Sequence, residues 1–422
     1  FHKVMTGTLK PILGYLMLAA GAGVIVNNLD PLGKMIEHGF HITGVVPNNE
    51  AIVAVAQKVL GVETMSILVV GLLMNLCIAR FTKFKYVFLT GHHSLFMACL
   101  MSAVLGTAGL SGMELILVGG FLMGAWSAIS PAIGQSYTSK VTDGDEIAIG
   151  HFGSLGYYLS AWVAKYVGKA DDSTEDIEIP EKWGFLRDST LSTALTMIVF
   201  YLIAAFAAGS EFVATLSGDM SPYLYAVMSA MNFAVGVTIV YSGVRMILGD
   251  LIPAFQGIAT KIIPNAIPAV DCAVFFTYAP TAVVLGFISS FIGGIIGMLI
   301  LGAVGGVLII PGLVPHFFCG ATAGIYGNAT GGRRGAAVGA FLNGLAITFL
   351  PAMALPVLGQ LGFQNTTFGD ADFAVMGLVL GNAYEWVGMA GIYGIVAIAA
   401  LVLIIPNFIK TKGKVINYVE ED

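Results

Sequence analysis

The sequence predicts an all-α polytopic membrane protein, and three observations support this fold class. Only 10% of the 422 residues are charged, 57% are apolar, and the mean hydropathy is +0.87. Soluble domains carry roughly 25% charged residues, so too few are present here to cover a water-exposed surface. Charge-free stretches near or above the ~20 residues that span a hydrocarbon core also recur along the chain. Because helices satisfy their own backbone hydrogen bonds over such stretches, we expect helices that cross a membrane.

The charge-free stretches predict about 10–11 transmembrane helices with additional re-entrant or interfacial segments. They are residues 11–29, 64–79, 86–113, 115–139, 189–210, 220–244, 272–332, 335–369 and 386–409. Prolines and glycine pairs interrupt the longest, 272–332, so it predicts two passes joined by an irregular stretch. Residues 165–188 form one strongly charged loop, and we treat residues 1–422 as a single transmembrane unit.

Three interrupted segments favour a transporter over a receptor or scaffold. Residues 41–60, 127–151 and 311–332 are too polar or too broken to cross as helices, yet each adjoins a predicted span. Non-helical backbone at membrane depth is stable only where it is buried or lines a wet cavity. External loops are the alternative for any one of them. A short echo, Gly7-x-Leu9-x-Pro11 and Gly249-x-Leu251-x-Pro253, fits the structural repeats of secondary-type transporters.

Basic residues predict the orientation of the chain. They gather in four segments, namely 80–85, the polar loop 165–188, Arg333–Arg334 and 410–414. Connections 106–113, 211–221 and 358–374 contain no Lys or Arg. The positive-inside rule places the first group and the C-terminus in the cytoplasm and the second group outside. The net charge of −6 argues against a nucleic-acid partner. The four scattered cysteines have no metal or redox spacing and are predicted to be packing residues.

Polar residues inside apolar stretches are candidates for a binding site. Asp271 stands at the start of the longest charge-free stretch, where a carboxylate is costly and indicates a site, a helix-end cap being the alternative. His92, His93 and His151 each follow a glycine-containing turn, and each could equally be an interfacial histidine. Glu50, after Asn49 in a proline-containing segment, is a similar candidate.

The sequence lacks the motifs of several enzyme classes. It has no GxxxxGK[ST], HExxH or GxSxG, so it predicts no built-in ATPase and gives little support to a protease or lipase. No cofactor and no metal site are expected. An intramembrane enzyme that uses the His and Asp residues is a weaker hypothesis than a transporter, whether or not the transporter is driven by an ion gradient.

Several blocks in order resemble the ascorbate-type enzyme IIC component of the bacterial phosphoenolpyruvate-dependent sugar phosphotransferase system. They are Gly7–Gly14, Ala20–Gly23, Leu89–His92, Val141–Gly144, Ile149–His151, Glu175–Asp176, Asp188 with Ser192–Ala194, Gly243–Met246, Pro268–Ala273, Tyr278–Pro280, Leu308–Gly312 and Phe317–Phe318. The resemblance covers almost the whole chain.

The resemblance implies a homodimeric permease of the bacterial inner membrane, with a core domain that holds the substrate and a second domain that forms the dimer contact. Family members carry a further helix upstream, which gives eleven. A partner IIB protein phosphorylates L-ascorbate at the cytoplasmic face with phosphate from IIA, so no residue of the IIC chain itself carries a phosphoryl group.

The resemblance also implies a substrate-binding set that includes His92, His151 and Asp271, with the Asn49–Glu50 turn opposite. Ascorbate is an enolate anion that histidines and helix N-termini can stabilise, while Asp271 accepts hydrogen bonds from hydroxyls. The ascorbate pattern has amide side chains at two further positions, which here are Phe96 and Phe152. His93 completes the candidate set. The two phenylalanines leave another small acid or sugar open as the substrate.

Overall fold

The computed structural model describes residues 2–41, 44–47, 49–144, 146–177, 189–261, 263–358 and 366–408. These residues are mostly helical, which confirms the predicted all-α polytopic membrane class. The α helices are α1 (His2–Gly39), α2 (Asn49–Phe81), α3 (Gly91–Thr107), α4 (Gly112–Thr142), α5 (Ser154–Val167), α6 (Ser189–Ala208), α7 (Ser210–Ser217), α8 (Pro222–Lys261), α9 (Pro280–Ala303), α10 (Leu313–Ala354), α11 (Ala371–Val387) and α12 (Met389–Ile404).

Seven of the described helices are long and apolar enough to cross a membrane. The number becomes eight if α6 and α7, which meet at 117°, form one bent span. The expected count was ten or eleven. It is higher because some apolar stretches fold into helices too short to qualify, such as α3 and α11 with 17 residues each. The two parts of α10, which meet at a break at Gly331 and Gly332, also count as one span.

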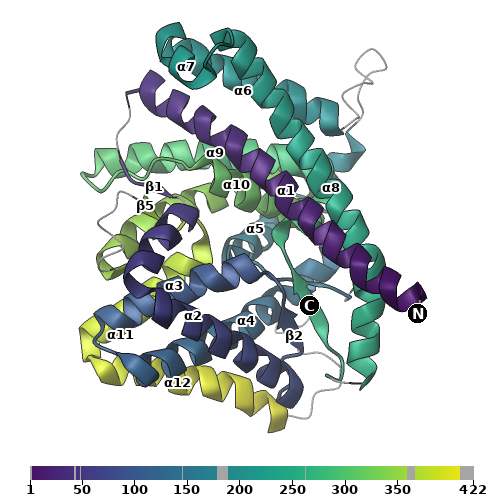
Figure 1. The fold of residues 1–422 in the computed structure, drawn as a ribbon, viewed down its shortest axis with the longest axis vertical. Coiled ribbons are helices and arrows are strands. Elements are labelled where there is room, and N and C mark those ends of the chain that lie inside the picture. Colours follow the sequence, from purple (N-terminus) through teal and green to yellow (C-terminus); the bar gives the residue numbers. More distant parts are fainter. Residues whose placement is uncertain are drawn as a thin grey trace.

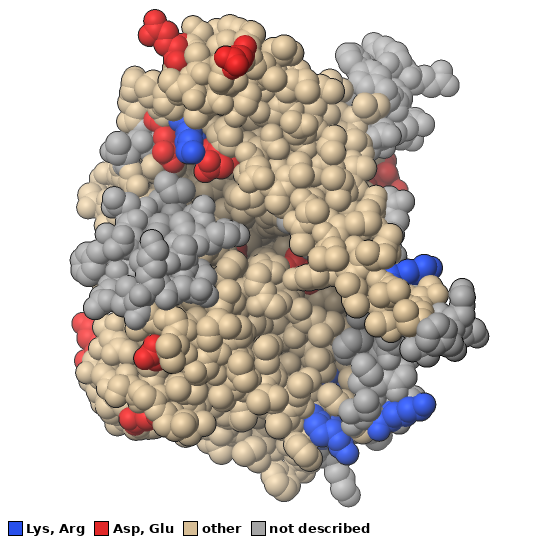
Figure 2. Space-filling view, in the orientation of Figure 1, with Lys and Arg blue, Asp and Glu red and all other residues tan. Residues whose placement is uncertain are grey.

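The helices form two groups with a third between them (Figure 1). Helices α1, α6, α7 and α8 pack together, with α1 running diagonally from the upper left to the lower right of the view, and α2, α3, α4, α11 and α12 pack together below. Helices α5, α9 and α10 lie between these groups, and two large apolar cores fill the interior. Figure 2 shows a mostly uncharged face with a hollow near its centre. The exposed apolar surface is what a lipid-embedded protein needs.

The three interrupted segments differ from their predictions to different extents. Residues 45–47 are extended before α2 begins at Asn49, as expected of a broken segment. Segment 127–151 was predicted wrongly in its first part, since α4 continues through Pro131 to Thr142. Segment 311–332 was also predicted wrongly over most of its length, since α10 begins at Leu313 and is interrupted only at Gly331 and Gly332. Pro315 does not break α10 because it lies in the first turn, where a missing N–H costs no hydrogen bond.

The glycines of segment 311–332 serve close helix packing rather than chain breaks. A Cβ built on Gly324 would stand 2.6 Å from the carbonyl oxygen of Ala282 and from the Cα of Gly286 on α9. Backbones can approach this closely only where side chains are absent. The glycine content therefore made a packed helix resemble a loop.

Part of the polar loop 165–188 is hydrogen-bonded to α10 at a sharp break in that helix. Gly331 and Gly332 leave helical geometry, and Gly332 has φ 60° and ψ −152°. The backbone N–H of Arg333 donates to the carbonyl of Asp172 at 2.7 Å, and its Nε donates to the carbonyl of Ser173 at 3.0 Å. The Arg333 side chain also lies 3.2 Å from the Asp172 carboxylate. These three contacts thus hold the polar loop against the break in α10. Residues 178–188 of the predicted loop lie outside the described residues.

The predicted structural repeat stays a prediction. Helices α1 and α8 lie side by side, and they contain the two copies of the short echo. Gly7–Pro11 lies near the start of α1, whereas Gly249–Pro253 lies near the end of α8. The two copies therefore occupy different places in their helices, and the echo lends the repeat no support.

Candidate functional site

Short parallel strands organise the centre of the molecule. β2 (Tyr86–Phe88), β4 (Ile267–Val270) and β3 (Ala148–Ile149) form a sheet in that order, and β1 (Val46–Pro47) pairs with β5 (Thr366–Thr367). The carboxyl ends of parallel strands meet at one edge, which is where ligands bind in open parallel sheets. Runs of two to four residues are too short to give a periodic signal, so the sequence did not predict these strands.

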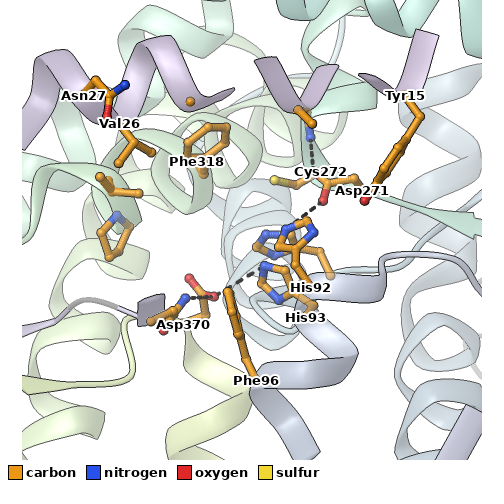
Figure 3. Close-up of a pocket in the computed structure, with 17 residues that line it drawn as sticks. Tyr15, Val26, Asn27, His92, His93, Phe96, Asp271, Cys272, Phe318 and Asp370 are labelled. Atoms are coloured by element: carbon orange, nitrogen blue, oxygen red, sulfur yellow. Dashed lines mark hydrogen bonds and ion pairs between the residues drawn. The ribbon is translucent and has the colours of Figure 1, made fainter. Parts of the chain in front are cut away.

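A polar residue follows each of the five strands, and all of these residues line one cavity of about 520 Å³ (Figure 3). They are Asn49 after β1, His92 and His93 after β2, His151 after β3, Asp271 after β4 and Asp370 after β5. Helix α1 supplies another wall, with Tyr15, Ala19, Gly23, Val26 and Asn27. Most of the predicted set is therefore brought together from segments far apart in the sequence.

Asp271 lies at the head of the short 3₁₀ helix Cys272–Thr277, at a break between β4 and α9, as predicted. Its Oδ1 accepts a hydrogen bond from the backbone N–H of Ala273 at 3.0 Å. Its Oδ2 is 3.4 Å from Nε2 of His92, yet it accepts no hydrogen bond from the described residues. A buried carboxylate oxygen without a hydrogen bond is costly. The geometry therefore combines a helix cap, the predicted alternative, with a free acceptor beside the cavity.

The rings of His93 and His151 are in contact, with centroids 3.7 Å apart and planes tilted by 43°, and both residues are buried. Nδ1 of His93 accepts from the backbone N–H of Phe152 at 3.3 Å. Nδ1 of His151 accepts from the backbone N–H of Gly153 at 3.2 Å and lies 2.8 Å from Tyr157 Oη. Because Nδ1 is the acceptor in each neutral ring, the proton is assigned to Nε2. Each ring then has an Nε2–H donor to offer.

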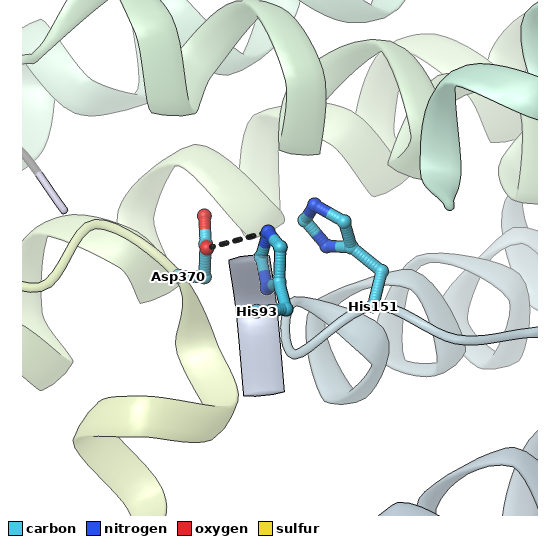
Figure 4. Close-up of side chains that lie close together, drawn as sticks. All are labelled: His93, His151 and Asp370. Atoms are coloured by element: carbon cyan, nitrogen blue, oxygen red, sulfur yellow. Dashed lines mark ion pairs between the residues drawn. The ribbon is translucent and has the colours of Figure 1, made fainter. Parts of the chain in front are cut away.

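The same tautomers bear on metal binding. Ligand atoms of His93, His151 and Asp370 lie within 4.8 Å of one another (Figure 4). Those of His151, Asp271 and Cys272 also lie within 4.8 Å of one another. A ring bound to a metal through Nε2 normally donates its other N–H to an acceptor. Here Nδ1 accepts instead, so both rings are better suited to donate from Nε2 than to ligate an ion. The donor set fits hydrogen bonding to a ligand.

The sequence analysis missed Asp370, which is buried at the cavity wall. Its Oδ2 accepts from Asn49 Nδ2 at 2.9 Å and lies 3.8 Å from His93 Nε2, and its Oδ1 accepts from Cys319 Sγ at 2.8 Å. The backbone N–H of Gly369 donates to Asn49 Oδ1 at 2.8 Å, so Asn49 joins the two turns. The available signal was a pair of acids, Asp370 and Asp372, at the edge of an apolar run, which is similar to the pattern that identified Asp271. Cys319 therefore does more than pack.

The two phenylalanines of the predicted set have different places. Phe96 lines the cavity, with its ring 5.7 Å from His92 and 5.5 Å from His93. Phe152 does not line the cavity: it is buried and stacked on Phe88 at 4.6 Å, its ring lies 6.2 Å from the ring of His93, and its backbone N–H donates to His93. The backbone of Glu50 lies in the first turn of α2, and its side chain is outside the described part of the structure.

Helix N-termini converge on the cavity. Asn49 begins α2, His92 and His93 lie in the first turn of α3, Val314 and Pro315 lie in the first turn of α10, and Asp370 is the N-cap of α11. An N-terminus carries partial positive charge and unpaired N–H groups, which favour anions. Together with the imidazole N–H donors, these termini offset the two carboxylates. The site suits a small polar ligand with acceptors and hydroxyls.

Broken segments, helix N-termini and a polar cavity among membrane-spanning helices define a membrane transport protein. Residues 1–372 match the family described as "EIIC-GAT: PTS system sugar-specific permease component". The chain belongs to this family of phosphotransferase-system permeases, as the sequence resemblance indicated.

A curated relative gives the family match more detail. The chain is 26% identical over 443 residues to the "Ascorbate-specific PTS system EIIC component" of Mycoplasma pneumoniae (strain ATCC 29342 / M129 / Subtype 1). The match covers 90% of this chain and 66% of the relative, so the chain spans about two thirds of that protein's length.

Proposed function

We propose that this chain is the substrate-translocating IIC subunit of a phosphotransferase system and takes up L-ascorbate for phosphorylation by a partner IIB protein, supplied by IIA. The observation that carries the proposal is the cavity in which four helix N-termini and the imidazole donors surround Asp271. Donors of this kind suit an enolate, and the free oxygen of Asp271 suits a hydroxyl. The named substrate of the Mycoplasma relative supports the same ligand.

Phe96 favours a second candidate substrate. A phenylalanine in the cavity wall, where the ascorbate pattern has an amide, offers a stacking surface and no hydrogen bond. Another small sugar or sugar acid is therefore the alternative, and transport without phosphorylation is the alternative mechanism. Binding of ascorbate by the purified protein, in competition with neutral sugars, distinguishes the two ligand classes.

Membrane vesicles test the coupling. With phosphoenolpyruvate and the soluble phosphotransferase proteins, we expect labelled ascorbate to accumulate as a phosphate ester inside the vesicles. Without those proteins, uptake should fall to passive equilibration, because the proposed phosphoryl donor is IIB and not this chain. Concentrative uptake driven by an ion gradient alone would contradict the proposal and favour a secondary transporter.

The proposed setting is the bacterial inner membrane, with the C-terminus in the cytoplasm and two chains forming a homodimer. The group α1, α6, α7 and α8 is our candidate for the dimer-contact domain, and the helices that bear the strand-end residues form the core domain. The separation of the two groups supports this division. Crosslinking between cysteines introduced on exposed faces of α6 and α8 tests it.

We propose that the cytoplasmic surface beside the α10 break contributes to IIB docking, and the two neighbouring arginines allow a sharp test. The Arg333 side chain contacts Asp172 and Ser173 of the polar loop, whereas Arg334 is exposed. Arg334→Ala should lower phosphorylation-coupled uptake and leave ascorbate binding and the melting temperature unchanged. Arg333→Ala should lower the melting temperature, because it removes bonds within the protein. Normal coupled uptake by Arg334→Ala would remove Arg334 from the docking surface.

A further inference from the structure

Asp372 is a second acid at the start of α11 and has no contact with the cavity. It is completely buried, and its carboxylate accepts three hydrogen bonds. The donors are Ser154 Oγ at 2.8 Å, the backbone N–H of Leu155 at 2.9 Å and Trp126 Nε1 at 3.2 Å. Burying a carboxylate in a membrane protein costs free energy. We therefore ask what Asp372 does that a neutral side chain would not do.

Two of those three bonds go to the first turn of α5. The N-cap of α5 is Gly153, which has no side chain to cap the helix. The carboxylate of Asp372 caps α5 instead, although Asp372 is 217 residues from Leu155 in the sequence. The carboxylate thereby lies at the positive end of the helix. The backbone N–H of Asp372 also donates to the carbonyl of Phe152 at 2.9 Å. The turn that leads into α5 is therefore held at both ends.

The held turn contains His151, which lines the cavity, and Phe152, whose N–H fixes the tautomer of His93. On the other side, Asp370 reaches the cavity from the same stretch of backbone, two residues before Asp372. A shift of α5 against α11 would thus move both histidines relative to Asp370. We infer that Asp372 is a positioning residue, which sets the two buried histidines of the substrate cavity by capping α5. This inference rests on the proposed function only in treating the cavity as the substrate site.

The test compares Asp372→Asn with Trp126→Phe in the purified full chain. The amide cannot accept from all three donors, so the cap on α5 weakens, and we expect ascorbate to bind about tenfold more weakly, which corresponds to one or two lost hydrogen bonds. Trp126→Phe removes a donor to the same carboxylate and leaves the cap in place, so its affinity should stay within about twofold by the same scale. Maximal uptake per folded protein should be unchanged in both variants.

A purely structural role predicts another pattern, namely less folded protein and a lower melting temperature with unchanged affinity in both variants. That result would overturn the inference, as would equal losses of affinity in the two variants. If Asp372→Asn does not fold, Ser154→Ala removes one cap bond and should weaken binding by a smaller factor than tenfold, with wild-type affinity contradicting the inference.

A readout without ligand separates this inference from the choice of substrate. In protein carrying isotope-labelled histidine, the resonance of His151, assigned with His151→Gln, should shift in Asp372→Asn and not in Trp126→Phe. If ascorbate fails to bind the wild-type protein, the proposed substrate is wrong and the histidine spectrum still decides the role of Asp372. An unshifted His151 resonance in Asp372→Asn would overturn it.

Discussion

Asp271→Asn should weaken substrate binding by at least ~1.5 kcal/mol, or more than tenfold in Kd, because hydrogen bonds to charged groups contribute about 1.5–3 kcal/mol. The oxygen Oδ2, which accepts no hydrogen bond from the described residues, is the group available to a ligand hydroxyl. The amide keeps the size of the side chain, and its remaining oxygen can still accept from Ala273 N–H. Folding and dimer formation should therefore change little.

Affinity and monodispersity measured on the same purified sample test this expectation. Asp143→Asn is the matched control, since Asp143 is exposed at the end of α4 in a left-handed conformation (φ 53°) that asparagine tolerates. It should leave binding unchanged. Wild-type affinity of Asp271→Asn in a monodisperse sample would remove Asp271 from the substrate site, and poor expression with normal affinity would make it a structural cap only.

Gly332→Ala should cause the largest loss of folded protein. The backbone at Gly332 (φ 60°, ψ −152°) lies in a region that only glycine adopts without strain, which costs about 1–3 kcal/mol for another residue. An added Cβ would also stand 2.3 Å from the carbonyl oxygens of Lys169 and Asp172. The clash would push the polar loop out of the α10 break. A lower melting temperature and weaker phosphorylation-coupled uptake are expected together.

Gly305→Ala separates the two contributions. Gly305 also has a positive φ, of 71°, but nothing lies within 4 Å of the position its Cβ would take. Gly305→Ala should therefore lose stability only through backbone strain. Its melting temperature should fall less than that of Gly332→Ala. Equal losses would show that the contact with the loop contributes nothing to stability.

The sequence predicted the candidate site better than it predicted the helix boundaries. Asp271, His92 and His151 stand out because each is a polar side chain beside a long apolar stretch, and the cost of burying it is a local property. Asp370 has the same character, but it lies in a connection that the orientation rule assigned to the outside, so its burial was not expected. Its partners Asn49 and Cys319 are 321 and 51 residues away. No local pattern encodes such pairings.

The errors in the helices have a different physical origin. Segments 127–142 and 311–330 contain Pro, Gly and Ser, which lower helix propensity in water. In a membrane bundle the same small residues allow backbones to touch, and the apolar surroundings leave the backbone no better partner than its own helix. Helix propensities that hold in water therefore predicted too many interruptions in these helices. The strands that do interrupt the helices were too short to be predicted from the sequence.

The pairing of β1 with β5 determines when the cavity is completed during synthesis. Val46 leaves the ribosome early, and its partner Thr366 follows some 320 residues later. Until then the turn at Asn49 lacks Gly369 and Asp370, and His93 and α5 lack the acids that hold them. A nascent chain inserted up to α10 thus exposes an unfinished polar hollow within the bilayer. In a chain that stops before β5, Asn49 and Cys319 accordingly lack the carboxylate to which both donate in the finished protein.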